Sequence, residues 1–396
     1  MHERITSAID AASGELVDLA RRIHGVPEVA FEERQAAAWL TETLERHGFK
    51  VKRGVADLET AFRAEVKGAH ARPAVAILAE YDALPEIGHA CGHNLICTGA
   101  IGAGIGLAAV REHLGGRAVV LGTPAEEGGG GKVIMLQHGA FEGIDAAIMF
   151  HPAGYTMSNR GSLASYRLSL KFLGKAAHAA AAPYEGINAL DALIQTFSSI
   201  GLLRQQTRED ARIHGIITYG GAAPNIIPDR AEAVFTVRAT DTAHALDLLH
   251  RVIHCAEGAA LATGATLEHT FRKGYEAMKP NHAMGQRFTR YLETLGYTPD
   301  APPERPRMGS TDMGDVSQVI PSVHPYVAIG PKDLPGHSVE FREAALSERG
   351  MRAMVAAAKA MALTAYDLLT DSEFLGEVRR EFEGNNNARV ALDRAG

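Results

Sequence analysis

The sequence is poor in cysteine and has no excess of basic residues. Its 396 residues include three cysteines, an odd number that offers no disulfide framework and is typical of a reducing compartment. The formal net charge is −7, so there is no basic field to neutralise a nucleic-acid backbone or to bind an anionic membrane. We therefore expect neither nucleic acid nor a membrane as a partner.

Long hydrophobic runs are also missing. No stretch approaches the roughly 20 apolar residues that cross a bilayer. Residues 1–24 have the periodicity of an amphipathic helix, with Ile5, Ile9 and Leu16 on one face, and lack the apolar core of a signal peptide. These features predict a cytoplasmic protein. The length exceeds what one compact core usually holds, so we expect two domains.

Four short apolar runs each end in a polar or glycine-rich loop. They are "PAVAILAEYDALP", "GRAVVLGTPAEEGGGGK", "IDAAIMFHPAG" and "PSVHPYVAIGPKDLPGHS". This pattern is typical of buried parallel strands, and ligands of such sheets bind beyond the carboxyl ends of the strands. The polar residues that follow these runs, which we expect to converge in space, are Glu80, Asp82, Glu126, Glu127, His151 and His337.

The pattern changes over residues 163–277, where strands and helices are predicted in the order β-α-β-β-α-β. This is the split arrangement of a ferredoxin-like domain. We therefore predict an α/β protein of two domains. Residues 1–162 and 278–396 form a mostly parallel α/β metal-binding catalytic domain, and residues 163–277 form an inserted ferredoxin-like α+β lid or dimerisation domain.

The segment "GHACGHN" places soft and borderline metal donors close together. Cys91 and His93 are of the types that borderline divalent cations favour, although a packed Cys–His pair is the alternative. A closed structural zinc site would show four Cys or His ligands at tight local spacing, which the chain lacks. With the convergent residues, the cluster predicts an open site in which two metals share one ligand and hold a hydroxide that attacks an amide.

The adjacent carboxylates of "AEEGGGGK" suit two different tasks in such a site. We assign Glu127 to metal binding and Glu126 to acid–base catalysis, because the reaction needs a group that moves a proton from water to the leaving nitrogen. A solvated acidic turn is the alternative interpretation.

Seven collinear motifs carry a family resemblance that spans nearly the whole chain. They are "AEYDALPEIGHACGHN", "TPAEEGGGGK", "FHPA", "GKAAHAA", "GGAAPNIIP", "GSTDMGDVS" and "GHS". The chain resembles the dinuclear-metal aminoacylase and carboxypeptidase family, in particular its p-aminobenzoyl-glutamate hydrolase subunits and β-alanyl-lysine dipeptidase-like amidohydrolases. Asn94 and Ile96 depart from the "CGHDxH" of auxin-conjugate and hippurate hydrolases, so the substrates of those enzymes do not transfer.

The resemblance implies a set of roles for the convergent residues. Cys91 would bridge two divalent ions per chain, Zn²⁺ or Mn²⁺ with Co²⁺ as a further candidate. Glu126 would be the base, and Asp82 would orient a metal ligand. The remaining ligands would be His93, Glu127, His151 and His337. His89 and His324 match no ligand position, although His89 could replace one.

The resemblance also implies that the lid takes part in catalysis. His178, Asn225 and Arg238 would contact the carbonyl oxygen and carboxylate of the substrate, although each is also compatible with an ordinary surface, turn or strand position. In the family this histidine reaches the neighbouring subunit's site, so a homodimer through the lid is expected. The "GSTDMG" loop would place Ser310 and Thr311 near the substrate's carboxylate.

These features predict metal-dependent hydrolysis of the amide bond in a small N-acyl amino acid or dipeptide. Two alternatives stay open. One is a metal-independent hydrolase with Cys91 as nucleophile. The other is a non-catalytic or partner-dependent subunit on the same fold.

Overall fold

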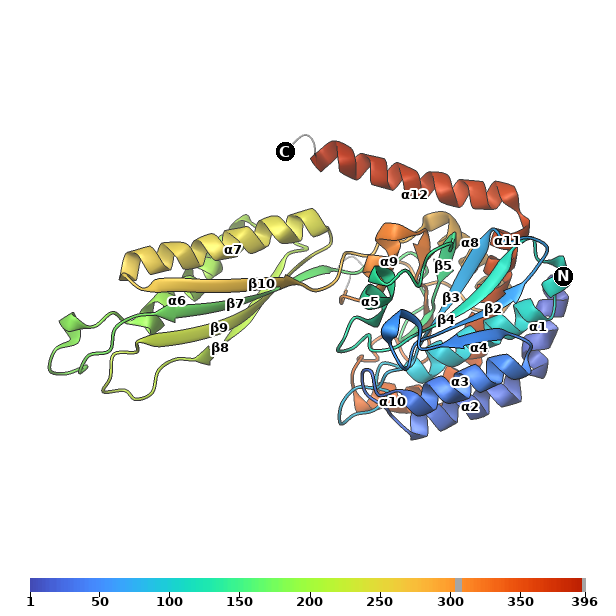
Figure 1. Ribbon diagram of the computed structural model, residues 1–396, viewed down its shortest axis with the longest axis horizontal. Coiled ribbons are helices and arrows are strands. Elements are labelled where there is room, and N and C mark those ends of the chain that lie inside the picture. The colour runs from blue at the N-terminus through green and yellow to red at the C-terminus, as the bar shows by residue number, and fades with distance from the viewer. Residues whose placement is uncertain (303–307, 394–396) are drawn as a thin grey trace. The chain divides into compact units, whose positions relative to one another are not determined.

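The computed structural model describes residues 1–302 and 308–393, and contacts within the chain divide it into two compact units. Unit 1 comprises Met1–Arg160, Lys279–Arg307 and Asp315–Gly396, and unit 2 comprises Gly161–Met278 and Met308–Gly314. The segment Met308–Gly314, which we expected in the catalytic domain, therefore groups with unit 2. Figure 1 shows the elements of each unit.

Unit 1 contains a six-stranded sheet in the order β1-β2-β4-β3-β5-β11 and a separate two-stranded parallel sheet of β6 and β12. In the larger sheet β3, β4, β5 and β11 run parallel, whereas β1 and β2 form an antiparallel edge. All seven residues of β3 are buried, as expected for a parallel strand covered on both faces. The strands are β1 (Lys50–Arg53), β2 (Phe62–Lys67), β3 (Ala74–Glu80), β4 (Arg117–Thr123), β5 (Ala146–Ile148), β6 (His151–Ala153), β11 (Ser322–Val323) and β12 (Tyr326–Ala328).

The helices of unit 1 pack around α4, which is buried along nearly its whole length. Glycine permits this packing: a β-carbon at Gly102 would lie 2.9 Å from Leu16 Cδ1. The helices are α1 (His2–Ala11), α2 (Ser13–Gly25), α3 (Arg34–Arg46), α4 (His93–Ala108), α5 (Gly131–Gln137), α8 (His282–Thr294), α10 (Val339–Ala344), α11 (Glu348–Thr370) and α12 (Ser372–Asp393); α9 (Met313–Val319) begins in unit 2 and ends in unit 1.

Helix α11 corrects one expectation from the sequence. It is long and apolar enough to cross a membrane by length and composition. However, 78% of its most apolar window is buried inside the structure, where α11 packs against α4 and α8. A core helix that is apolar on most sides passes the same test.

Unit 2 has the β-α-β-β-α-β order that the sequence predicts. Its antiparallel sheet has the order β10-β7-β9-β8, and α6 and α7 pack on one another and on the sheet through a core that includes Leu168, Phe172 and Phe235. The elements are β7 (Ala164–Leu173), α6 (Ala189–Leu203), β8 (Arg212–Tyr219), β9 (Arg230–Ala239), α7 (Thr242–Thr263) and β10 (Thr266–Lys273).

Candidate metal centre

Parallel strands of unit 1 carry several predicted site residues to one edge of the sheet. Strand β3 ends at Glu80 and β4 ends at Thr123, and the two strands pair in parallel register. Their carboxyl ends therefore meet at the same edge. Asp82 follows β3 directly, and Glu126 and Glu127 follow β4 in the next loop.

Gly92 separates Cys91 from His93 and caps the amino end of α4. Its φ of +78° is in the left-handed region, and a β-carbon there would lie 2.5 Å from Pro152 Cγ. Any other residue would be strained and would clash. The loop therefore brings Cys91 and His93 to this position because residue 92 is glycine.

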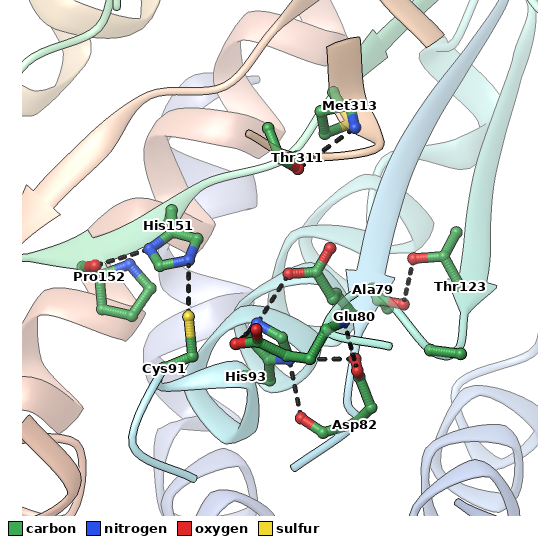
Figure 2. Close-up of polar contacts among 12 residues, drawn as sticks. Ala79, Glu80, Asp82, Cys91, His93, Thr123, His151, Pro152, Thr311 and Met313 are labelled. Atoms are coloured by element: carbon green, nitrogen blue, oxygen red, sulfur yellow. Dashed lines mark hydrogen bonds and ion pairs between the residues drawn. The ribbon is translucent and has the colours of Figure 1, made fainter. Parts of the chain in front are cut away.

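Cys91, His93 and His151 form the first group of potential ligands. Their ligand atoms all lie within 4.8 Å of one another, and Cys91 Sγ lies 3.4 Å from His151 Nε2 (Figure 2). Each imidazole donates its Nδ1–H to a backbone carbonyl at 2.7 Å, that of Asp82 for His93 and that of Pro152 for His151. Each ring therefore turns its Nε2 toward the site, which is the usual arrangement of metal-binding histidines.

Cys91, Glu127 and His337 form the second group. Their ligand atoms also lie within 4.8 Å of one another, with His337 Nε2 at 3.3 Å from Glu127 Oε1. His337 has a left-handed backbone, with φ at +58°, and its N–H donates to the carbonyl of Ala90. This bond ties the "GHS" loop to the "GHACGHN" loop. The two groups thus share Cys91.

The donors fit two divalent ions that share the sulfur of Cys91. Among the described residues, His93 Nε2 and Glu127 Oε1 are buried and have no hydrogen-bond partner; their nearest charged neighbours are Glu80 at 3.0 Å and His337 at 3.3 Å. A buried polar atom without a hydrogen bond is costly, and a cation would satisfy both atoms. Thiolate, imidazole and carboxylate are also the donors that Zn²⁺ and similar ions use in open sites.

The electrostatics of Cys91 and His151 argue against an activated cysteine. Burial raises the pKa of the Cys91 thiol far above its ordinary value; His93 opposes this rise and Glu127 adds to it. Burial also lowers the pKa of His151 to about 4. The pair is therefore a thiol beside a neutral imidazole, whereas a reactive cysteine needs surroundings that favour the thiolate. A divalent cation would supply that stabilisation.

Asp82 contacts one residue from each ligand group. It is 1% exposed, its Oδ2 accepts the backbone N–H of Glu127 at 2.9 Å, and its Oδ1 lies 3.1 Å from His93 Nδ1. Burial raises the pKa of Asp82, but the positive field of His93 and the hydrogen bonds outweigh burial and lower it overall. A buried ionised carboxylate in this position supports the orienting role predicted for Asp82.

Glu126 is half-buried beside the two ligand groups. Its carboxylate forms a further group with Glu80 and His93, again within 4.8 Å. A general base needs such a place next to the reacting water. The sequence indicated that Glu80 converges here but gave it no role, and it did not indicate Lys132, which pairs with Glu80. The only signals were the position of Glu80 two residues before Asp82 and the lysine that ends "EEGGGGK".

His89 and His324 do not join any of these ligand groups within the part of the chain that the structure describes. His89 is 1% exposed, and burial lowers its pKa to about 3. His324 is buried with its ring 5.5 Å from that of His151, and burial lowers its pKa well below the ordinary value. Both are neutral histidines in the wall of the site.

The other predicted residues lie in unit 2, where His178 and Asn225 are neighbours. The chain forms an isolated antiparallel bridge at His178 and Ile226, and the N–H of Ala179 donates to the carbonyl of Asn225 at 3.0 Å. His178 Nδ1 accepts two backbone N–H groups at 3.2 Å, so the ring hydrogen of neutral His178 is on Nε2. The exposed side chain thus offers an N–H donor.

Arg238, Ser310 and Thr311 also belong to unit 2. Burial lowers the pKa of the half-buried Arg238 guanidinium, whose Nε has no hydrogen-bond partner within residues 1–302 and 308–393. Ser310 Oγ is likewise buried without a partner in those residues, whereas Thr311 Oγ1 accepts the N–H of Met313. Free donors on Arg238 and Ser310 suit an anionic group.

Comparison with protein families identifies the chain. The model of peptidase family M20/M25/M40 matches residues 76–364, which is more than half of the sequence. The protein belongs to this family. The resemblance seen in its motifs is thereby confirmed.

Curated relatives of this M20 protein include peptidases and amidohydrolases. It is 39% identical to the Xaa-Arg dipeptidase of Mus musculus, over 97% of this chain and 92% of that protein. It is 31% identical to one of the subunits of the p-aminobenzoyl-glutamate hydrolase of Escherichia coli, over 96% of this chain and 94% of that protein. The M20 protein is therefore a metal-dependent hydrolase of amide bonds in small substrates.

Solved structures share the fold. A putative aminohydrolase of methicillin-resistant Staphylococcus aureus superposes with a TM-score of 0.80 at 19% identity, covering 93% of this chain and 100% of that chain. The YXEP protein of Bacillus subtilis, described as a dinuclear metal binding peptidase from the M20 family, gives a TM-score of 0.73 at 23% identity, covering 91% and 99%. The predicted α/β class is thus confirmed. The ligand groups of the M20 centre themselves suit divalent metals.

Proposed function

We propose that the M20 protein hydrolyses the amide bond of N-acyl amino acids or dipeptides, with two divalent ions and with Glu126 as general base and acid. The observation that carries this proposal is the sharing of Cys91 Sγ by two groups of ligand atoms, some of them buried and without a hydrogen bond. The names of the relatives support the substrate class, since a dipeptide and p-aminobenzoyl-glutamate both place an amide next to a carboxylate.

The protein's own groups divide the chemical work. When bound, the divalent ions would polarise the scissile carbonyl and acidify water. The Glu126 carboxylate accepts a proton from that water and returns it to the amide nitrogen as the C–N bond breaks. In this proposal the Nε2–H of His178 donates to the carbonyl oxygen as it becomes negative. Arg238, Ser310 and Thr311 bind the substrate's carboxylate, and Asn225 contacts the substrate beside His178.

The donor set favours Zn²⁺ as the ion, with Mn²⁺ and Co²⁺ as the other candidates. A shared thiolate and three imidazoles are soft and borderline donors, which suit Zn²⁺ better than Mn²⁺. We also propose a cytoplasmic location, because an exchangeable thiolate ligand is best preserved where cysteines stay reduced.

A homodimer through unit 2 is the proposed assembly. Strand β8 is an edge of its sheet and carries Ile216 and Ile217, which are 66% and 45% exposed. Leu202 on α6 is 78% exposed. An apolar edge strand favours pairing with a second chain. Sedimentation should find dimers for the wild type and monomers for Ile216→Lys. Leu261→Lys, on the exposed side of α7, is the control and should remain a dimer. A monomeric wild type would overturn this assembly.

Metal analysis and chelation test the function directly. The purified protein should hold close to two divalent ions per chain and should hydrolyse members of a panel of N-acyl amino acids and β-alanyl dipeptides. Chelation should abolish the activity, and Cys91→Ala should lower both metal content and rate. Full activity in metal-free protein would instead favour the Cys91 nucleophile, and a metal-loaded protein inactive on the whole panel would favour a non-catalytic subunit.

A further inference from the structure

Glu33 is a fully buried carboxyl group that lies between helix α3 and the loop of the paired carboxylates. Its Oε1 accepts the N–H of Ala125 at 2.9 Å, and its Oε2 accepts the hydroxyl of Thr60 at 3.0 Å. Ala125 directly precedes Glu126 in the sequence. Glu33 therefore contacts the backbone that carries the proposed base, although it is not a member of any ligand group formed by the described residues.

The carboxyl of Glu33 does not cap its own helix. Glu33 is the N-cap residue of α3, where a side chain commonly accepts N–H groups of the first turn, but it makes no such hydrogen bond. Glu28 caps the helix instead, since its two oxygens accept the N–H groups of Gln35 and Ala36 at 3.0 and 2.9 Å. Burial raises the pKa of Glu33 to about 7 from 4.5, so a carboxyl here lowers stability as pH rises toward 7. Neither helix capping nor stability accounts for this residue.

The residue that Glu33 contacts, Ala125, determines the shape of the loop. Ala125 is fully buried and has a left-handed backbone, with φ at +59°. Its carbonyl accepts the N–H groups of Gly129 and Gly131 at 3.1 and 3.3 Å. The turn that contains the paired carboxylates therefore begins and closes at Ala125. An alanine in this conformation persists only where other contacts enforce it, and the hydrogen bond from its N–H to Glu33 is such a contact.

Phe31 contacts the other end of the same turn. It also has a left-handed backbone, with φ at +65°, which is a genuine outlier for a bulky residue. A β-carbon at Gly129 would lie 2.3 Å from Phe31 Cε2, so the ring fills the space that a side chain at residue 129 would need. Residues 31–33 thus hold the turn at two points, Phe31 at Gly129 and Glu33 at Ala125.

We propose that Glu33 is a positioning residue for the general base. Its carboxyl fixes the left-handed backbone of Ala125 and thereby directs the Glu126 side chain toward the reacting water. Glu127 has a different support, because Asp82 Oδ2 accepts its backbone N–H at 2.9 Å. The adjacent carboxylates are thus oriented separately, Glu126 through Glu33 and Glu127 through Asp82. This inference rests on the proposed function, because it takes Glu126 as the base.

Steady-state kinetics with metal analysis test this role. Glu33→Ala should keep both ions and a KM near that of the wild type but lose about 10- to 100-fold in kcat, because a small misplacement of a reacting group costs about 10²-fold. Glu33→Gln keeps a carbonyl oxygen for the N–H of Ala125, and its amide donates to the Thr60 hydroxyl, so it should recover most of the lost turnover. Thr60→Val removes the hydrogen bond that holds Oε2 and should give an intermediate kcat.

A double-mutant cycle shows whether Glu33 acts through Glu126. Glu126→Gln removes the group that Glu33 positions. Adding Glu33→Ala to Glu126→Gln should therefore leave the residual turnover within about 2-fold, since residues that act as one unit are strongly non-additive. The same Glu33→Ala change in the wild type should have its full effect.

Hydrogen exchange of the metal-free protein tests the contact without any measurement of activity. Glu33→Ala should speed exchange of the backbone N–H groups of residues 124–131 and leave exchange in residues 82–92 unchanged. Asp145→Ala is the matched control. This buried carboxylate also accepts a backbone N–H, that of Ala74 at 2.8 Å, at the amino end of β3. Asp145→Ala should lower the unfolding temperature and leave both kcat and exchange in residues 124–131 unchanged.

The outcomes distinguish this inference from the proposed function. Wild-type kcat in Glu33→Ala would overturn the positioning role, and so would an equal loss from Glu33→Ala in the wild type and in Glu126→Gln. Loss of metal from Glu33→Ala would also overturn it, because the carboxyl would then support Glu127. Each of these results leaves the proposed function standing. A wild type that hydrolyses no member of the substrate panel would overturn the proposed function and this inference with it.

Discussion

Replacing Gly92 by alanine should reduce both stability and metal affinity. At a φ of +78° an alanine is in the left-handed region, which costs about 1–2 kcal/mol. Its β-carbon would lie 2.5 Å from Pro152 Cγ and 3.2 Å from Phe341 Cε1. Such overpacking typically costs about 1–3 kcal/mol. The free energy of unfolding should therefore fall by about 2–5 kcal/mol.

The same clash should separate the ligands. Relief requires either the loop that carries Cys91 and His93 or the strand that carries His151 and Pro152 to move, and each movement changes the spacing of the first ligand group. Loss of such positioning typically lowers metal affinity about 10- to 100-fold.

A second glycine, Gly54, separates the free-energy cost of the left-handed conformation from the cost of the steric clash. Gly54 has a φ of +65° and open space where a β-carbon would point. Gly54→Ala should lose only about 1–2 kcal/mol and should bind Zn²⁺ like the wild type. Thermal unfolding of the metal-free proteins and competition with a chelator measure the two effects. Wild-type affinity in Gly92→Ala would refute the idea that this glycine sets the spacing of the ligands.

Three further predictions concern the base, the lid and pH. Glu126→Gln should keep both ions and lose about 10²- to 10⁴-fold in turnover, whereas Glu127→Gln should lose metal; metal analysis with the reverse result would exchange the two assignments. Verified heterodimers of His178→Ala and Glu126→Gln chains should recover up to about half of the wild-type activity per dimer, because one site would be intact, and no recovery would contradict a site completed across the dimer. Burial raises the pKa of Glu33 to about 7 from 4.5, so the stability this group contributes is complete below pH 4.5 and is lost as pH rises through about 7. Urea unfolding between pH 5 and 8 should therefore show a fall of about 3 kcal/mol in the wild type that Glu33→Gln lacks, and equal slopes would show that Glu33 is not the cause.

The sequence predicted the elements well where burial left a simple pattern. Strand β3 is buried on both faces and reads as a continuous apolar run, so both its position and the polar groups after it could be predicted. The alternation in β7 similarly follows from a sheet covered on one face by α6 and α7. The boundary at Met308–Gly314 could not be predicted, because it depends on which unit that short loop packs against.

At the centre, the sequence could indicate only residues that lie in recognisable motifs or directly after predicted strands. Lys132 and Glu80 are 52 positions apart, and nothing in the sequence shows that they form an ion pair. Nor does residue type separate ligand histidines from His89 and His324, since all of them are found in apolar or loop contexts. What separates them, among the described residues, is the convergence of other donors: His93, His151 and His337 each lie within 4.8 Å of Cys91 in a ligand group that His89 and His324 do not join.

Left-handed backbone conformations help to fix the positions of the ligands at the centre. Each of the three ligand loops contains a left-handed residue: Gly92 between two ligands, Ala125 directly before the paired carboxylates, and His337, itself a ligand. At Ala125 and His337 a side chain is present, so the conformation costs about 1–2 kcal/mol each and persists only because other contacts enforce it. Those contacts are visible: Glu33 accepts the N–H of Ala125, and the carbonyl of Ala90 accepts that of His337. The metal-free folded state therefore already contains this backbone strain. Metal that binds only to the folded state stabilises it and so offsets part of the free-energy cost of the strain.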